Sequence, residues 1–290
     1  MIFHHVRPIV DTAEWIAATA DVDQVLRQLR QLCFVDFGTL LLEMPHPDLP
    51  NLSRVLPRTP SVDVQKAWTG THGFDLFRVT KDFTLRLQHH FETLCGRPLH
   101  GARILDYGVG YGRLARAMLY FTDPRNLYGL DPWDAAIDLC RKDNVLGNFA
   151  LSDYLPARLP LESRQFDLIY SYSVFTHTSP RAARAALTAL RDHVQPNGLL
   201  VITVRPLEFW NDAPYQIERP EYDRLRLTRE YTETGYAHLP NNFRIVDGDH
   251  VYGDATIAPE WIVANCPQWN LRGYDRGEDL SQTLFLMTPA

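Results

Sequence analysis

Residues 104–114 contain an acidic residue followed by three glycines at alternate positions, a spacing that can hold a cofactor at the end of a strand. Asp106 comes first, and Gly108, Gly110 and Gly112 follow it. Glycine adopts positive φ without steric cost, and its missing side chain lets the backbone approach a ligand closely. Apolar residues before Asp106 predict a buried strand, and the pattern after Gly112 predicts a helix. Strand, glycine loop and helix form the first unit of a nucleotide-binding α/β sheet.

The acid and the glycine spacing together indicate which cofactor this loop holds. A dinucleotide-binding loop has its third glycine three residues after the second, where this chain has Arg113. A carboxylate at Asp106 would also repel a pyrophosphate and attract a cationic ligand. S-adenosylmethionine is cationic at its amino group and at its sulfonium, so we expect it in preference to NAD. An NAD-dependent oxidoreductase stays open as an alternative.

A second acidic residue follows the next predicted strand. Asp131 lies 19 residues after Gly112, close to the roughly 20 expected for an acid that binds ribose hydroxyls. Its two oxygens can accept from two neighbouring O–H donors. The alternative is a turn or helix-cap aspartate before Pro132. Trp133 could cover the adenine or the ribose, or it could pack in the core.

A third acid follows the third predicted strand. Asp153 can accept a hydrogen bond from an adenine amino group, since residues at strand ends make such contacts. Tyr154 is its neighbour and could pack on the ring. The alternative is an exposed loop acid.

Short apolar runs alternate with helical patterns from residue 102 onward, which predicts an α/β fold with a largely parallel sheet. We expect a helical cap over residues 1–98 and a cofactor-binding domain over 99–290, with 206–242 inserted as a lid. That insertion is rich in aromatic residues, which suit sugar or ring stacking but also a plain apolar lid. The strands are expected at 102–105, 126–130, 148–151, 166–171, 199–204, 269–274 and 282–287, and helices at 21–33, 82–93, 134–143, from 180 onward and at 259–265.

Composition excludes several classes of function. The 290 residues carry a formal net charge of −6 and no Lys/Arg run, which argues against a nucleic-acid partner. No apolar run is long enough for a membrane span, and the amino terminus lacks a secretion signal, so cytoplasm is the expected location. The four cysteines are scattered, and we expect neither a metal site nor disulfides. The oligomeric state is not indicated.

In the order of its motifs, the chain resembles the class I S-adenosylmethionine-dependent methyltransferases. The resemblance covers about residues 102–205 well and the last strands loosely. Residues 173–177, Ser-Val-Phe-Thr-His, resemble a bacterial subset linked to modification of sugars, glycolipids or other small metabolites. The motifs that carry the resemblance lie at 104–114, 129–131, Asp153, 166–177 and 196–200.

The resemblance implies a Rossmann-like, seven-stranded sheet whose last strand is antiparallel. It places the methionine part of the cofactor at Asp106 and the glycines, with Tyr107 in the same motif. The ribose would lie at Asp131 and the adenine at Asp153, and backbone near Ser171 would flank the methyl group.

His177 follows the fourth predicted strand, on the edge where acceptors enter this kind of sheet. Methyl transfer to an alcohol needs a general base near neutral pH, and His177 is the candidate. The alternative is a structural histidine before the helix that Ser179 can cap. We therefore expect O-methylation of a small-molecule or glycan hydroxyl. A non-catalytic protein that keeps the fold and the cofactor is a further alternative.

Overall fold

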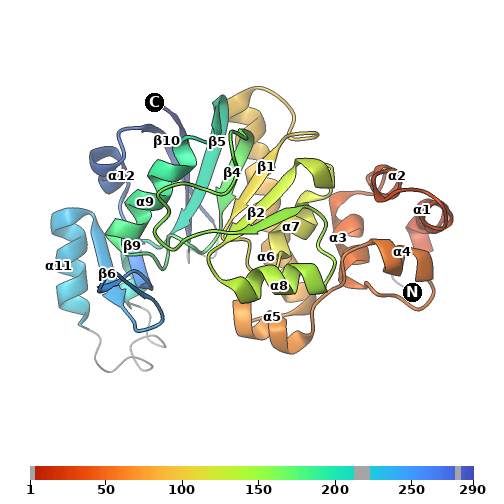
Figure 1. The fold of residues 1–290 in the computed structure, drawn as a ribbon, viewed down its shortest axis with the longest axis horizontal. Coiled ribbons are helices and arrows are strands. Elements are labelled where there is room, and N and C mark those ends of the chain that lie inside the picture. The colour runs from red at the N-terminus through yellow and green to blue at the C-terminus, as the bar shows by residue number, and fades with distance from the viewer. Residues whose placement is uncertain (1–3, 212–222, 278–281) are drawn as a thin grey trace. The chain divides into compact units, whose positions relative to one another are not determined.

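The computed structural model describes residues 4–211, 223–277 and 282–290. The chain divides into two compact units, one ending at Leu151 and one beginning at Ser152. Strands of both belong to a seven-stranded sheet with the order β10-β11-β5-β4-β1-β2-β3 (Figure 1). The expectation of a seven-stranded α/β sheet is confirmed.

In the first unit, three short parallel strands alternate with helices. β1 (Ile104–Tyr107) pairs with β2 (Leu127–Asp131), and β2 pairs with β3 (Asn148–Leu151). All four residues of β1 are buried, which explains its uninterrupted apolar start. The connecting elements are α7 (Arg113–Met118), η2 (Pro124–Asn126) and α8 (Asp134–Lys142).

Residues before β1 are helical, as expected, but their boundaries differ from the prediction. Asp21 caps its helix by accepting from the Gln24 backbone N–H at 3.0 Å, yet that helix ends at Leu29 instead of residue 33. The helix predicted over 82–93 begins much earlier, at Gly73. The elements are η1 (His4–Val6), α1 (Arg7–Ala17), α2 (Val22–Leu29), α3 (Phe34–Leu42), α4 (Pro50–Val55), α5 (Val62–Thr69) and α6 (Gly73–Cys95).

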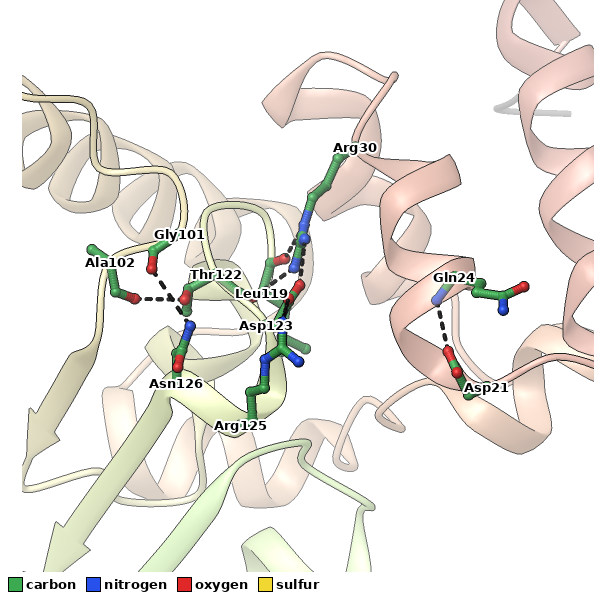
Figure 2. A network of polar contacts seen from close by, with 10 residues as sticks. All are labelled: Asp21, Gln24, Arg30, Gly101, Ala102, Leu119, Thr122, Asp123, Arg125 and Asn126. Carbon is green, nitrogen blue, oxygen red and sulfur yellow. Dashed lines mark hydrogen bonds and ion pairs between the residues drawn. The ribbon is translucent and has the colours of Figure 1, made fainter.

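Arg30, directly after α2, joins these helices to the segment between α7 and β2 (Figure 2). Its guanidinium donates to the backbone oxygens of Leu119 (3.0 Å) and Thr122 (2.6 Å) and to Asp123 Oδ1 (2.7 Å). The Arg30 and Asp123 side chains are 17% and 18% exposed. Thr122 in turn donates to the Ala102 carbonyl at the start of the β1 segment. One arginine therefore fixes the N-terminal helices to the glycine-loop unit.

The second unit supplies the other four strands of the sheet. β4 (Phe166–Ser171) and β5 (Val194–Val204) are parallel. β11 (Thr283–Pro289) runs antiparallel to both β5 and β10 (Trp269–Arg276), so the prediction of an antiparallel last strand is confirmed. The helices that flank these strands are α9 (Pro180–Arg191) and α12 (Pro259–Asn265).

β5 begins five residues earlier than its apolar pattern predicts. Val194 pairs with Phe166, and Leu199 pairs with Leu168, so the residues 195–198 make an irregularity between two registers. α9 correspondingly ends at Arg191, before β5 begins. Polar and glycine residues within a strand are the reason why periodicity missed its start.

The segment predicted as a lid forms its own small structure where it is described. Trp210 is fully buried with Leu227, Ala237 and Leu239, and its indole N–H donates to Thr256 Oγ1 at 2.8 Å. Its aromatic residues 215 and 222 lie outside the described residues. The elements from 207 onward are η3 (Leu207–Asn211), α11 (Arg224–Thr234), β6 (Tyr236–Pro240), β7 (Ile245–Val246), β8 (Asp249–His250) and β9 (Gly253–Ile257).

In the ranges that the model describes, no helix has the length and apolar character needed to cross a membrane.

Substituting Arg30 tests the attachment of the N-terminal helices. We expect Arg30→Ala to lower the free energy of unfolding by about 2 kcal/mol, because it removes hydrogen bonds of a charged donor and leaves Asp123 without this partner. Denaturant unfolding measures the change. The control is Arg7→Ala, whose partner Asp11 lies 2.8 Å away with both side chains more than half exposed. That variant should change stability by no more than about 0.5 kcal/mol, and equal losses in the two variants would contradict the attachment role.

Candidate functional site

The loop after β1 is held by backbone hydrogen bonds to the neighbouring strand. Asp106, 1% exposed, lies in β1 beside Gly129 in the pairing with β2. The backbone N–H groups of Gly108 and Val109 both donate to the Leu130 carbonyl, at 2.7 and 2.9 Å. The loop therefore leaves β1 already fastened to the end of β2.

Gly110 and Gly112 meet two separate demands. Both have left-handed backbone conformations, with φ of +54° and +79°. A Cβ on Gly112 would lie 2.9 Å from Val145 Cγ1 and 3.1 Å from Cys140 Sγ, closer than side chains normally approach. Gly110 is less crowded, with Trp68 Cζ3 at 3.4 Å from its Cβ position. Conformation and close packing thus require glycine at 112.

Asp131 ties the glycine loop to the loop after β2. Its Oδ2 accepts from the Gly110 backbone N–H and its Oδ1 from the Trp133 backbone N–H, both at 2.9 Å. The side chain is largely buried, and burial raises the pKa of this carboxyl, while the two hydrogen bonds act in the opposite direction. Each oxygen keeps a lone pair for a further donor. The carboxylate can therefore accept from two hydroxyls of a ligand.

Trp68 packs beside this loop. It belongs to α5, and its ring stacks on Trp133 with centroids 4.7 Å apart. It also meets Tyr111 edge-on, with centroids 6.0 Å apart. A tryptophan just before the turn at Gly70 was visible in the sequence, but its partner was not. One face of Trp133 is therefore covered by Trp68.

Three predicted cofactor residues belong to the second unit. Asp153 is exposed in the loop after β3, with its carboxyl open to a ligand. Tyr154 beside it is half-buried, and the Arg244 guanidinium carbon lies 4.7 Å from the centroid of its ring. Ser171 is fully buried at the end of β4.

His177 is held by contacts on several sides. Its Nδ1 lies 2.8 Å from the Gly253 carbonyl oxygen, and its ring stacks on Tyr252 with centroids 5.1 Å apart. A carbonyl oxygen only accepts, so Nδ1 carries the proton. Nε2 lies 3.5 Å from Arg205 Nη2, which only donates. The neutral ring consistent with these partners has its lone pair on Nε2.

Asp254 and Arg205 complete this cluster. Asp254 is 6% exposed, and its Oδ1 lies 3.4 Å from His177 Nδ1. Arg205 donates to the same oxygen at 2.6 Å and to the Thr176 carbonyl at 2.9 Å. A histidine with a carboxylate behind one nitrogen and a lone pair on the other is suited to accept a proton.

The polar residues of the segment 250–260 separate into two groups. Tyr252 and Asp254 contact His177, whereas the His250 ring bonds to the Asn241 carbonyl at 3.0 Å and Glu260 lies on α12. Arg205 was missed, although a charged residue directly after a buried strand was the signal that could have found it.

Cys140 touches the glycine loop but is not a nucleophile. Its Sγ donates to the Gly110 carbonyl at 3.3 Å. Burial, opposed by the charge of Arg116 and assisted by the nearby Asp106 and Asp131 carboxylates, raises the pKa of the thiol to about 12. A protonated thiol of this kind is inert.

A family described as "Methyltransferase domain" matches residues 104–198. The chain is similar in structure to the magnesium protoporphyrin IX methyltransferase of Synechocystis PCC 6803 with bound SAH. Their identity is 14%, the match covers 79% of this chain and 94% of that one, and the TM-score is 0.50.

Two other similar structures have lower scores. One is the glycopeptide N-methyltransferase MtfA, with 16% identity over 80% of this chain and 99% of that one, and a TM-score of 0.48. The other is an S-adenosylmethionine-dependent methyltransferase of Clostridium acetobutylicum ATCC 824, with 11% identity over 79% and 96% and a TM-score of 0.47. No curated protein matches the sequence significantly.

Comparing Gly112 with Gly70 separates the effect of backbone conformation from the effect of crowding. Gly70 has φ of +74° with nothing within 4 Å of its Cβ position, whereas Gly112 is crowded. We expect Gly70→Ala to cost about 1 kcal/mol of stability from the left-handed conformation alone. Gly112→Ala should cost at least about 1 kcal/mol more, because overpacking adds to it. Denaturant unfolding compares the two variants, and equal costs would show that crowding at position 112 is unimportant.

Proposed function

We propose that the chain is a class I S-adenosylmethionine-dependent methyltransferase and that it methylates a hydroxyl group of a small molecule or glycan. The observation that carries the proposal is the His177 ring, whose Nδ1 is engaged by Gly253 and Asp254 and whose Nε2 has the lone pair. An alcohol needs such a base near neutral pH, since its own proton must leave as the methyl group arrives.

The first unit holds most of the residues that we propose for the cofactor. S-adenosylmethionine supplies an activated methyl group on a cationic sulfonium. Asp106, a buried acid, suits the cationic methionine part, together with Tyr107 and the backbone of the glycine loop. Asp131 suits the ribose, because each of its oxygens has a lone pair beyond its backbone hydrogen bond. Trp133 would lie beside the ribose or the adenine.

Residues of the second unit would serve the rest of the cofactor. We propose that Asp153 accepts from the adenine amino group, because its carboxyl is exposed. Tyr154 would flank the ring, although one face of it already carries Arg244. Backbone at Ser171 would lie beside the transferred methyl group. These roles follow the order of the motifs along the chain.

The acceptor hydroxyl would take the place of the 3.5 Å Arg205 contact at His177 Nε2 and lose its proton there. Asp254 holds the opposite nitrogen and compensates the positive charge that forms on the ring. Arg205 positions Asp254 through its 2.6 Å contact and holds the Thr176 backbone beside His177. Positioning of this kind supplies most of the catalysis when the leaving group is already activated.

Aromatic rings beside His177 favour a flat or ring-shaped acceptor. Tyr252 stacks on His177, and Phe243 lies with its centroid 5.1 Å from that of Tyr252. Phe243 is half exposed, so this surface is accessible. Sugar rings and aromatic rings both pack on such faces.

We further propose that residues 1–98 act as a cap and 99–290 as the methyltransferase domain, with 206–242 as its lid. The contacts of Trp68 with Trp133 and Tyr111 support a cap that reaches the glycine loop. In the described part of the lid, the Phe209 ring packs against Arg205. The Arg205 guanidinium carbon lies 4.1 Å from the centroid of that ring.

Asp131→Ala tests the ribose role. We expect the affinity for S-adenosylhomocysteine to fall about tenfold or more, because two acceptor oxygens are lost. Titration calorimetry measures it. Asp134→Ala is the matched control, since this exposed aspartate of α8 bonds only to the adjacent Ala135 N–H in the described contacts. An unchanged affinity in Asp131→Ala, with the fold intact, would remove the ribose role.

His177→Asn tests the general base. The substitution keeps a possible donor toward Gly253 but has no basic nitrogen, so we expect methyl transfer to hydroxyl acceptors to fall roughly 100-fold or more. The assay follows labelled methyl from S-adenosylmethionine into a panel of monosaccharides, glycolipids and phenols. His250→Asn is the control, because the His250 ring contacts the Asn241 carbonyl.

The panel also separates the competing functions. Retained activity in His177→Asn would remove the base role, and labelling of amines alone would overturn the hydroxyl acceptor. Binding of S-adenosylhomocysteine without labelling of any acceptor would favour a non-catalytic protein.

A further inference from the structure

Arg244, in the second unit directly before β7, carries a charge that the surrounding side chains leave uncompensated. In the described part of the chain, no Asp or Glu lies within ion-pair distance of it. Its Nε is buried without a hydrogen-bond partner. Its two Nη atoms are neither hydrogen-bonded to a described residue nor buried, so they reach solvent from a half-buried side chain. The N–H donors on the Nη atoms are therefore open to an acceptor from outside the chain.

The acids that follow Arg244 in the chain are bound by a different arginine. Asp247 and Asp249 belong to the hairpin of β7 and β8. Arg181 pairs with both, through Nη2 at 2.9 Å from Asp247 Oδ2 and Nη1 at 3.7 Å from Asp249 Oδ2. Asp153, another exposed acid of this unit, forms no ion pair with Arg244 within the described residues. Arg244 is thus left to pair with an anion that the chain does not supply.

Two aromatic rings hold the Arg244 guanidinium in place. Its central carbon lies 4.7 Å from the centroid of the Tyr154 ring and 5.7 Å from that of the Phe243 ring. Cation–π contacts of this kind attract the guanidinium to the rings and restrict its rotation. A planar fork that is already oriented loses less entropy when it binds an anion. Arg244 is therefore preorganised for a ligand.

The same series of rings continues to the proposed base. The Phe243 ring lies beside Tyr252, with centroids 5.1 Å apart, and Tyr252 stacks on His177 at the same distance. Phe243 is half exposed, so a ligand can reach this surface. A ring-shaped acceptor beside Tyr252 and Phe243 would have His177 at one end and Arg244 at the other.

Main-chain hydrogen bonds fix Arg244 relative to His177. Val251 donates its N–H to the Arg244 carbonyl at 3.2 Å, and its own carbonyl accepts from the Ser179 N–H at 3.1 Å. Two residues further along, the Gly253 N–H donates to the His177 carbonyl at 2.8 Å. One extended segment therefore bonds to the backbone of both residues, so their separation is set by the fold.

We infer that Arg244 determines acceptor specificity by binding an anionic group, a carboxylate or a phosphate, of the molecule that is methylated. The inference rests on the proposed function, because it takes His177 as the place of the acceptor hydroxyl. The acceptor is then a hydroxylated ring compound that carries a negative charge. Carboxylates and phosphates share the oxygen geometry that the guanidinium fork binds with two parallel hydrogen bonds.

The test is titration calorimetry on the full chain saturated with S-adenosylhomocysteine, so that the carboxylate of the cofactor is already bound in its own site. The probes are matched in shape and differ in charge: 4-hydroxybenzoate against 4-hydroxybenzyl alcohol, and glucuronate and glucose 1-phosphate against glucose. We expect at least one anion to bind with one site per chain and about tenfold or more tighter than its neutral partner. The member that binds tells carboxylate from phosphate. Equal affinities within every pair, or no binding of any anion, would overturn the inference.

Variants of two arginines locate the anion. Arg244→Gln should abolish the preference for the anion and leave the affinity for its neutral partner unchanged. Arg244→Lys should keep part of the preference, because it retains the charge without the planar fork. Arg226→Gln is the control for net charge, since Arg226 pairs with Glu230 on its own helix α11. A preference that survives in Arg244→Gln, or that Arg226→Gln removes equally, would overturn the inference.

Transfer of labelled methyl from S-adenosylmethionine to the same compounds separates this inference from the proposed function. Labelling of the hydroxyl of an anionic member, reduced about tenfold or more in Arg244→Gln, would support both. Binding that depends on Arg244 without labelling of any hydroxyl would overturn the proposed hydroxyl transfer and leave the anion site in place. Equal labelling of anionic and neutral partners would support the proposed function and overturn the role of Arg244.

Discussion

The buried carboxylate of Asp131 makes the interaction on which the loops of the first unit depend. It fastens the glycine loop through Gly110 and the loop after β2 through Trp133, so one side chain joins the two loops. Burial raises its pKa, which means that folding disfavours its ionised form. Stability therefore falls as pH rises through the interval between its unfolded and folded pKa values. Two more donors from a ligand would favour the ionised form and offset this cost.

That constraint explains why the first unit was predictable from the sequence. An acid at the end of one strand, glycines in the next loop and a second acid after the following strand are all local features, and backbone hydrogen bonding fixes what they do. Gly112 adds the steric part, because Val145 and Cys140 fill the space that a side chain would take. The ends of strands were found well, since burial of parallel strands produces apolar runs that stop at loops.

Element boundaries and residue pairs were not predicted where they depend on contacts between segments distant in the sequence. α6 extends back to Gly73, where Leu76, Phe77 and Thr80 continue the buried face of the helix. β5 starts at Val194 across polar residues that only its pairing with β4 explains. Trp68 and Arg205 are single residues whose partners, Trp133 and Asp254, are distant in sequence. Sequence spacing cannot reveal such pairs. His177, in contrast, could be proposed from the sequence because it follows β4.

The cluster around His177 joins segments that the sheet alone would leave independent. Arg205 follows β5, Thr176 follows β4, and Asp254 lies in β9, yet one guanidinium bonds the last two. The backbone repeats this link, because the Gly253 N–H donates to the His177 carbonyl at 2.8 Å while the Gly253 carbonyl receives the ring Nδ1–H. Gly253 tolerates no Cβ, since the Leu239 carbonyl oxygen would lie 2.1 Å from it. The orientation of the imidazole is thus set by main-chain packing, and the carboxylate of Asp254 acts on a ring that is already in place.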